Sequence, residues 1–339
     1  MPSNRHCALD SALPRVVVAG GIDMDITISV DRHPLPGEEL AGSDLRFLPG
    51  GKGANQAVAA ARAGARVSMV GCVGRDPFGD RMVAFLQSEQ VDTSHVERLD
   101  DVPTGVALVV VASDGENTIV YSAGASQGLA LDRLPAMEPG DVLISQLEVP
   151  TAAILRVLGE GRRRGAVNVF NAAPRRRLEP GIIDLVDVLV VNEFELALAI
   201  GRGGIDPANR TEVAAAVGAL SRPADQVVIV TLGAAGAVVF DRDRTVWIDA
   251  HPVAPVDTTG AGDAFVGALG AALCRGASLD DATAYANASA AMAVTRRGAG
   301  PSMPFRAEVE SGIASNPAIT VEPPTGGTTD PAVRSHDAR

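Results

Sequence analysis

The feature that most constrains the fold of this chain is a regular alternation of short apolar runs with longer alanine-rich stretches. The apolar runs are rich in β-branched residues and are continuous in polarity, which is typical of strands buried on both faces of a parallel sheet. They occupy residues 15–20, 66–72, 141–145, 166–170, 186–191 and 226–232. Stretches with a helical pattern follow or lie between them, at residues 53–64, 77–90, 151–164, 193–200, 210–220, 262–275 and 280–295. We therefore predict an α/β protein with a mostly parallel central sheet between two layers of helices, a three-layer α/β/α sandwich.

Two regions depart from this alternation and predict antiparallel pairing. Residues 106–112 and 117–122 flank the turn sequence Ser-Asp-Gly-Glu, which is typical of a β-hairpin. With part of residues 26–47, this hairpin is expected to form a small separate sheet. Residues 236–240 and 245–249 predict a second antiparallel pair at an edge of the main sheet.

Composition and charge exclude several classes of function. The formal net charge of −12 argues against general affinity for nucleic acid or anionic membranes, which requires basic patches. Cys7, Cys72 and Cys274 stand apart from one another without CxxC spacing, so we expect neither a disulfide framework nor a structural zinc site. No apolar run reaches the roughly 18 residues of a membrane-spanning helix, and the first residues lack the apolar segment of a secretory signal. A cytoplasmic protein is the expectation.

The two ends of the chain differ from the region between them. Residues 1–14 are polar and irregular, and we expect a flexible tail there. Residues 313–339 are rich in Pro, Gly and Thr, which predicts a disordered tail. One folded domain is therefore predicted over residues 15–312.

A run of small residues with an acid stands at the start of a predicted helix, in the sequence VDTTGAGDAF at residues 256–265. The first amides of a helix have no acceptor within the helix and lie at the positive end of its dipole. Gly260, Ala261 and Gly262 have little or no side chain, so an anion can approach those amides closely. Asp263 then stands beside the anion as a candidate base for a hydroxyl that attacks phosphorus, with the amides stabilising the developing charge.

An ordinary helix start is the alternative interpretation of this stretch. Thr259 would be the N-cap, and Asp263 would be favoured by the helix dipole. Capping requires neither the two glycines on either side of Ala261 nor the second acid at Asp257. These extra features favour the anion site.

A second glycine-rich loop, PGGKGANQA at residues 49–57, precedes another predicted helix. The chain contains neither the phosphate-loop pattern GxxxxGK[ST] nor the dinucleotide pattern GxGxxG. Gly51 and its neighbouring glycines allow a polar ligand to approach the backbone, and Lys52 and Asn55 would supply donors to its hydroxyls. A plain loop with a solvated lysine is the alternative.

Acidic residues follow the predicted strands at residues 15–20 and 141–145, the first and the third in chain order. Asp23 and Asp25 are two residues apart and would point the same way in an extended segment, where paired carboxylates accept hydrogen bonds from sugar hydroxyls. Glu148 follows a third strand and is a further candidate acceptor for a substrate hydroxyl. All three side chains are equally compatible with ordinary loop acids. Because open α/β sheets bind ligands at the carboxyl ends of their strands, we keep them as candidates.

The sequence NEFE at residues 192–195 also joins a strand to a helix. Asn192 and Glu195 have the spacing of a capping box. The alternative is a hydrated Mg²⁺ site, because this ion keeps several waters and binds few protein oxygens together with substrate phosphates. Thr231 and Gly233, at the end of a later strand, are candidates for lining a nucleotide site.

Taken in chain order, these motifs resemble those of the ribokinase-type (PfkB) family of carbohydrate kinases. The likeness covers roughly residues 15–312 and includes GGKGANQAVAAARAG, TGVALVVV, NEFE, DTTGAGDAF and AVTRRGAGPS. The first and fourth of these motifs are highly specific. The resemblance implies a mostly parallel sheet between helices and a small β lid, from about residues 22–48 and 104–122, that closes over the sugar. It also implies a homodimer formed through the lid, with ATP, Mg²⁺ and an activating K⁺ as cofactors and a sugar as substrate.

The resemblance further implies a role for each matching position. Asp263 corresponds to the catalytic base, and the anion hole corresponds to Gly260, Ala261 and Gly262. The sugar-binding positions are Asp23, Asp25, Gly51, Lys52, Asn55 and Glu148. Nucleotide-side positions are Asn192, Thr231, Gly233, Gly262 and Asn287, and Glu195 belongs to the motif tied to Mg²⁺. The potassium positions are Asp257, Thr259, Ala293, Arg296, Gly298 and Ser302.

One position departs from the family pattern, and it leaves the substrate open. Family members usually carry Asn-x-Asp after the first strand, where this chain has Asp23-x-Asp25. An amide both donates and accepts hydrogen bonds, whereas an ionised carboxylate only accepts them. The resemblance implies phosphorylation of D-ribose to D-ribose 5-phosphate. Deoxyribose, another sugar or a nucleoside are the alternative substrates, and a non-catalytic sugar sensor is the alternative from another class.

Overall fold

The computed structural model describes residues 14–114, 116–130, 134–179, 181–242, 244–314 and 319–322. Within them, ten strands form one central sheet. In spatial order the strands are β14 (Ile319–Glu322), β13 (Arg244–Ile248), β12 (Ala237–Asp241), β11 (Val227–Thr231), β10 (Val188–Asn192), β9 (Val167–Asn171), β8 (Val142–Gln146), β1 (Val16–Ala19), β4 (Val67–Gly74) and β5 (Asp92–Leu99). The pairs from β5 through β11 are parallel, and β12, β13 and β14 add antiparallel strands at one edge. The predicted mostly parallel sheet is confirmed.

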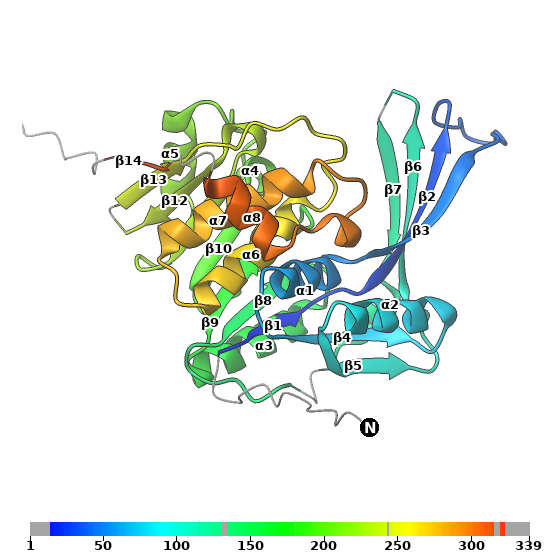
Figure 1. Ribbon diagram of the computed structural model, residues 1–339, viewed down its shortest axis with the longest axis horizontal. Coiled ribbons are helices and arrows are strands. Elements are labelled where there is room, and N and C mark those ends of the chain that lie inside the picture. Colours follow the sequence, from blue (N-terminus) through cyan, green and yellow to red (C-terminus); the bar gives the residue numbers. More distant parts are fainter. Residues whose placement is uncertain are drawn as a thin grey trace, which may run out of the picture.

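Helices cover both faces of this sheet (Figure 1). One face carries α1 (Lys52–Arg62), α2 (Pro77–Ser88), α6 (Ala261–Cys274), α7 (Leu279–Ala293) and α8 (Arg306–Ala314). The other carries α3 (Thr151–Arg164), α4 (Glu193–Ala199) and α5 (Arg210–Gly218). In β1 the side chains of Val16 and Val18 enter one core, and those of Val17 and Ala19 enter the other. Burial on both faces explains why the strand runs are continuously apolar.

A separate four-stranded sheet projects from this body (Figure 1). Its strands, in spatial order, are β3 (Ser43–Gly50), β2 (Asp23–Val30), β6 (Gly105–Ala112) and β7 (Asn117–Ser122). The predicted hairpin is the antiparallel pair β6–β7, and β2 joins it by pairing parallel to β6. We call this sheet the lid. Its position confirms that residues from two distant parts of the sequence form a small sheet beside the main one.

Three elements were not predicted. Strand β5 is a half-exposed edge strand with many polar residues, so it lacks the apolar run that marks the inner strands. Helix α8 extends to Ala314, and β14 pairs with β13 inside the region expected to be a disordered tail. The predicted boundary at residue 312 is therefore corrected in part. The remainder of that tail, and the predicted tail at residues 1–13, lie outside the described residues.

The order of strands reverses between β1 and β8, because the chain continues from β1 to β4 on one side and from β8 to β9 on the other. Ligands of open α/β sheets bind at the carboxyl ends of the strands at such a reversal. The first turn of α1 meets this point, where a Cβ on Gly53 would lie 2.7 Å from the Gly20 carbonyl carbon. Only a glycine at residue 53 allows the helix to begin so close to β1.

Helices α1 and α6 also approach each other closely, at Gly267. A Cβ at this position would overlap the carbonyl oxygen of Gln56 and lie 2.5 Å from Ala59 Cβ. We expect Gly267→Ala to lower the free energy of unfolding by about 1–3 kcal/mol, because the two helices must separate. Chemical denaturation followed by circular dichroism measures this.

The matched control is Gly159→Ala in the middle of α3, where an added methyl group meets no atom within 4 Å. This variant should gain about 0.4–1 kcal/mol through the reduced entropy of the unfolded chain. Equal effects of the two substitutions would contradict the assigned helix contact.

Candidate active site

Asp263 lies in the first turn of α6 and is 4% exposed. Both of its carboxylate oxygens accept hydrogen bonds from side-chain amides: Asn55 Nδ2 donates to Oδ2 at 3.0 Å, and Gln56 Nε2 donates to Oδ1 at 2.9 Å. Both donors belong to the first half of α1. The packing of α1 against α6 therefore fixes the direction of this carboxylate.

A buried chain of amide groups supports the Asp263 contact from behind. Gln146 Nε2, at the end of β8, donates to Gln56 Oε1 at 2.6 Å, and Gln56 Nε2 also lies 3.1 Å from Asn171 Oδ1 at the end of β9. Sequence reasoning assigned no role to Gln56, Gln146 or Asn171. The available signal was polar side chains at the ends of apolar strands and on an alanine-rich helix face, which are seldom buried without a partner.

The start of α6 forms one wall of a cavity of about 220 Å³. Gly260 is in the left-handed conformation with φ 78°, the Ala261 amide donates to Thr258 O at 3.3 Å, and the Ala264 amide donates to Gly260 O at 2.8 Å. The amides of the first turn that lie between have no acceptor within their own helix. The cavity is lined by Lys52, Asn171, Ala173, Val190, Asn192, Glu195, Thr231, Thr258, Gly260, Ala261, Gly262 and Asp263. The structure thus gathers the predicted anion site, the acid and Lys52 around one space.

A larger cleft of about 600 Å³ opens between the lid and the body, and it shares Thr258 with the smaller cavity. Asp25 lines this cleft from β2. Glu148 Oε2 accepts a hydrogen bond at 2.7 Å from the backbone amide of Lys52, a residue that lines the smaller cavity. Gly51 precedes that amide with φ 85°, and a Cβ there would lie 2.7 Å from the Asp23 amide nitrogen. A left-handed backbone and this close approach both require glycine at residue 51.

The electrostatics of this region are those of several buried acids around one lysine. Burial, and then the negative charge of Asp263, raise the pKa of Asp25 to about 6. Burial raises the pKa of Glu148 to about 7, although Lys52 opposes the shift. The charge of Asp263 raises the pKa of Lys52, so the lysine stays cationic. The site therefore holds a fixed cation between carboxylates that ionise reluctantly.

Asp23 has hydrogen-bond partners that the sequence did not predict. Its side chain is 1% exposed and lies outside both cavities. Tyr121 Oη donates to Asp23 Oδ2 at 3.2 Å, and Ser126 Oγ donates to Oδ1 at 3.4 Å. Burial, together with the charges of Glu148 and Asp25, holds the pKa of Asp23 well above its ordinary value. Asp23 thus connects β2 of the lid to β7 and to the turn that follows it.

Asn192 and Glu195 confirm the predicted capping box, and their role toward Mg²⁺ stays a prediction. They form a reciprocal capping box at the start of α4, in which Asn192 Oδ1 accepts from the Glu195 amide at 2.8 Å and Glu195 Oε2 accepts from the Asn192 amide at 2.9 Å. Both residues also line the smaller cavity. Burial raises the pKa of Glu195, although the Asn192 amide and the positive charge of Lys52 oppose the shift.

The nucleotide-side positions are only partly brought together. Thr231 lines the smaller cavity at the end of β11. Gly233 begins the next turn and Asn287 Nδ2 donates to Asp249 O at 2.9 Å, and both residues lie outside the two cavities.

The predicted potassium positions centre on Asp257. Its Oδ1 accepts from the Thr259 amide at 2.9 Å and its Oδ2 from the Gly298 amide at 2.8 Å, and all three residues line the larger cleft. Burial pushes the pKa of Asp257 up, but hydrogen bonds from Gly298 and Thr259, together with the charge of Arg297, lower it overall. The remaining positions, Ala293, Arg296 and Ser302, belong to the end of α7 and the segment after it. Among the described residues, no group of three or more His, Cys, Asp or Glu side chains is placed to hold a metal ion.

The raised pKa of Asp25 yields a test of stability. Because the folded chain holds this proton more tightly than the unfolded chain, stability falls as the pH rises from about 4 to about 6, and the loss persists above that. We expect Asp25→Asn to raise the free energy of unfolding at pH 8 by up to about 3 kcal/mol and to have little effect at pH 4. Urea denaturation at the two pH values measures this. Asp31→Asn, at an exposed position next to the same strand, should change stability by less than about 0.5 kcal/mol at either pH.

Comparison with known proteins agrees with this geometry. The profile of the pfkB family carbohydrate kinases matches residues 13–306. The ribokinase of Haemophilus influenzae is 35% identical over 297 residues, which cover 86% of this chain and 96% of the relative. The ribokinase of Mus musculus is 36% identical over 87% of this chain and 93% of the relative.

Solved structures show the same arrangement. A structure of Arabidopsis thaliana ribokinase complexed with ribose and ATP superposes with a TM-score of 0.78 at 28% identity, covering 89% of this chain and 99% of that one. A ribokinase from Cryptococcus neoformans in complex with ADP gives a TM-score of 0.75 at 32% identity, covering 88% and 99% of the two chains. In the described part of this chain, no helix is long and apolar enough to cross a membrane. With the lid, the cavity at the start of α6 and these likenesses taken together, the chain belongs to the pfkB family of carbohydrate kinases.

Proposed function

We propose that this carbohydrate kinase phosphorylates D-ribose with ATP to give D-ribose 5-phosphate and ADP. The observation that carries the proposal is the Asp263 carboxylate, oriented by Asn55 and Gln56 beside the first amides of α6. The ribokinases that are similar to this chain over most of its length support ribose as the sugar. A ribokinase complexed with ribose and ATP supports the pairing of these two substrates.

In the proposed mechanism the sugar occupies the inner end of the larger cleft. Asp25 and Glu148 accept hydrogen bonds from its hydroxyls, and Lys52 and Asn55 donate to its oxygens. The hydroxyl that reacts lies at Asp263, which takes its proton as the oxygen attacks the γ-phosphorus of ATP. A bond forms between the sugar oxygen and phosphorus, and the bond from phosphorus to the bridging oxygen of ADP breaks. Catalysis in this arrangement consists mainly of positioning and electrostatic stabilisation.

The start of α6 supplies the anion hole of this mechanism. Gly260, Ala261 and Gly262 line a cavity that the phosphoryl group would enter from the nucleotide side. Negative charge that develops on the phosphoryl oxygens is stabilised by these amides and by the positive end of the helix dipole. Lys52, in the wall of the same cavity, adds a full positive charge.

The residues of the smaller cavity fit Mg²⁺ carried by the nucleotide. Glu195 presents a buried carboxylate beside Asn192 and Thr231, which are further oxygen donors, and Lys52 lines the same cavity. Mg²⁺ characteristically binds a few protein oxygens, water and substrate phosphates, so a dedicated protein cage is not required. When bound, the ion would neutralise charge on the β- and γ-phosphates.

Asp257 fits a monovalent cation such as K⁺. Both of its oxygens accept from backbone amides, so the carboxylate is held ionised while lone pairs remain for an ion. The further donors would be oxygens of Thr259, Ala293, Arg296, Gly298 and Ser302. A cation here would lie next to the loop that begins α6 and would help to fix its backbone.

Asp23 is the reason to keep other substrates in view, but its hydrogen bonds within the protein weaken that reason. Its two oxygens already accept from Tyr121 and Ser126, so the replacement of the family's usual asparagine is satisfied within the protein. Asp23 is not among the residues that line the larger cleft. Deoxyribose, another sugar or a nucleoside therefore remain second candidates.

The lid also offers a surface for the proposed homodimer. Strands β6 and β7 expose apolar side chains, including Leu108, Ile119, Val120 and Tyr121, which are between 41% and 63% exposed. Leu108 and Val120 are paired across the two strands and lie on one face of the lid, and burial of that face between two copies would remove it from water. We further propose that the enzyme acts in the cytoplasm.

Replacing the proposed base tests the mechanism. We expect Asp263→Asn to lower kcat by at least about a thousandfold, because the attacking hydroxyl loses its proton acceptor. The Kd for the sugar should change little. A coupled assay of ADP release measures turnover, and calorimetry measures sugar binding. Asp80→Asn is the matched control, because Asp80 is likewise an acid in the first turn of a helix. Near-normal turnover by the Asp263 variant would refute the assigned role.

A substrate panel tests the sugar. With MgATP we expect D-ribose to give the highest kcat/KM, followed by 2-deoxyribose, with fructose and adenosine at least about tenfold lower. The reason is that each missing or displaced hydroxyl leaves one of Asp25, Asn55 or Glu148 without its partner. Higher kcat/KM with a nucleoside would overturn the choice of ribose. Absence of sugar-dependent ATP turnover with every compound would favour the non-catalytic sensor instead.

A further inference from the structure

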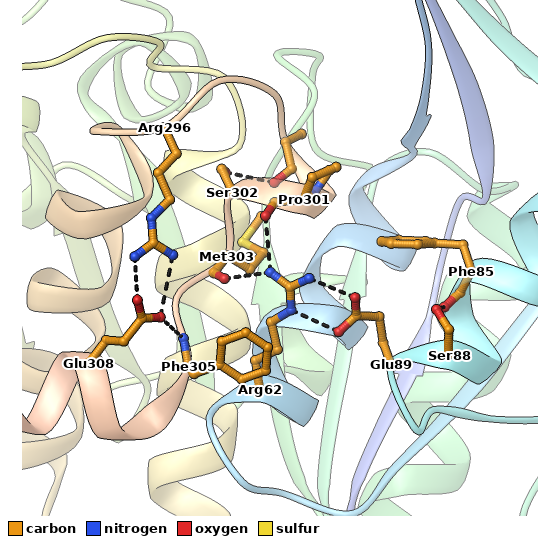
Figure 2. Close-up of polar contacts among 11 residues, drawn as sticks. Arg62, Phe85, Ser88, Glu89, Arg296, Pro301, Ser302, Met303, Phe305 and Glu308 are labelled. Carbon is orange, nitrogen blue, oxygen red and sulfur yellow. Dashed lines mark hydrogen bonds and ion pairs between the residues drawn. The ribbon is translucent and has the colours of Figure 1, made fainter.

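Arg62, the last residue of α1, forms hydrogen bonds to a stretch of backbone that is distant in the sequence (Figure 2). Its Nη1 donates to the carbonyl oxygens of Pro301 at 3.0 Å and Met303 at 2.7 Å. Its Nε and Nη2 donate to the two carboxylate oxygens of Glu89 at 2.8 and 2.6 Å. The guanidinium also stacks on Phe305, with 4.8 Å from Cζ to the ring centroid. Arg62 and Glu89 are only 11% and 14% exposed, so water screens this cluster weakly.

The backbone that Arg62 holds covers Gly260, the residue that begins the proposed anion hole. We call residues 298–303 the covering segment. A Cβ on Gly260 would lie 2.9 Å from Ala299 Cα and 3.3 Å from Met303 Cε. Ala299 is 3% exposed and Met303 is fully buried. The left-handed turn at Gly260 is therefore packed beneath a segment whose own position depends on Arg62.

The covering segment is tied down at its other end as well. The Gly298 amide donates to Asp257 Oδ2 at 2.8 Å. Just before the segment, Arg296 forms a two-contact ion pair with Glu308, whose Oε2 also accepts from the Phe305 amide at 2.7 Å (Figure 2). With both ends fixed, the segment can hold the turn at Gly260 in one place.

The chemistry at residue 62 is specific to arginine. Four N–H groups of the guanidinium are used at once, in a planar arrangement that serves two carbonyls and one carboxylate. A lysine ammonium has three donors around one nitrogen and cannot serve the two backbone carbonyls and the carboxylate of Glu89 at the same time. Because Arg62 lies outside both cavities, it has no contact with the sugar or the nucleotide in the proposed mechanism.

We propose that Arg62 is a positioning residue for phosphoryl transfer. It holds the covering segment on Gly260 and thereby fixes the backbone amides at the start of α6. The proposal rests on the proposed function for its catalytic consequence, whereas the effect on the backbone is independent of any reaction. Both ends of α1 then contribute to the proposed site. Lys52 and Asn55 lie in its first turn, and Arg62, its last residue, holds the covering segment.

The experiment compares Arg62→Lys, Arg62→Gln and the milder Glu89→Gln in the full-length protein. We expect kcat to fall about ten- to hundredfold in the Arg62 variants and less in Glu89→Gln, because a misplacement of about 1 Å is enough for such a loss. The Kd for D-ribose should stay within about threefold, since the sugar contacts lie at the other end of α1. Amide hydrogen exchange over residues 257–264 should become at least about fivefold faster.

The control is Arg15→Gln, which removes the ion pair of the Arg15 side chain with the buried Asp141 at the amino ends of β1 and β8. It should lower Tm without changing kcat or exchange at residues 257–264. Unchanged exchange in all the Arg62 and Glu89 variants would overturn the proposal, as would a fall in Tm with kcat within twofold of normal. If the unmodified protein shows no turnover with any sugar, the proposed function fails, and the exchange measurement alone decides the role of Arg62.

Discussion

The close crossing of α1 and α6 is the contact on which the rest of the site depends. Gly267 lets the two helices approach until the amides of Asn55 and Gln56 reach the carboxylate of Asp263. Neither helix could form the site alone, because α1 brings donors and α6 brings an acid and unpaired backbone amides. Both helices begin at the carboxyl ends of strands, near the reversal of strand order between β1 and β8. The sheet topology thus places the starts of α1 and α6 close together, and the absence of a side chain at Gly267 lets the two helices come into contact.

The site is also where the fold is least favourable to its own stability. Burial raises the pKa values of Asp25, Glu148 and Glu195, and among these acids Lys52 is the cation that offsets their charge. A chain optimised for stability alone would replace such acids with neutral residues. A kinase that must hold sugar hydroxyls and bind a cation-laden nucleotide needs acceptors in these positions. The two apolar cores on the two faces of the sheet offset the stability that is lost by burying these acids.

The sequence was sufficient to predict those features that depend on local pattern. Continuous apolar runs predicted the inner strands. The turn sequence at residues 113–116 predicted the β6–β7 pair of the lid. Strand β5 was missed because an edge strand is half solvated and its polar residues conceal it. Strand β14 was missed because Pro, Gly and Thr around it suggest disorder, whereas pairing with β13 decides its structure. Both errors arise where a tertiary contact outweighs local composition.

Candidate site residues could be predicted where a motif suggests a ligand. Residues whose partners are other parts of the protein could not be predicted from the sequence. Asp263 and the glycines before it were identified because an acid and bare amides at a helix start have few structural uses. Gln56, Tyr121 and Arg62 carried no such signal, since their roles are defined only by contacts with residues far away in the sequence. Asp23 was singled out by its spacing from Asp25, but its two hydroxyl partners within the protein were not predictable from that spacing. Short-range spacing can therefore identify a group that faces a ligand, but the groups that hold it in place become visible only when the sheet and its helices are assembled.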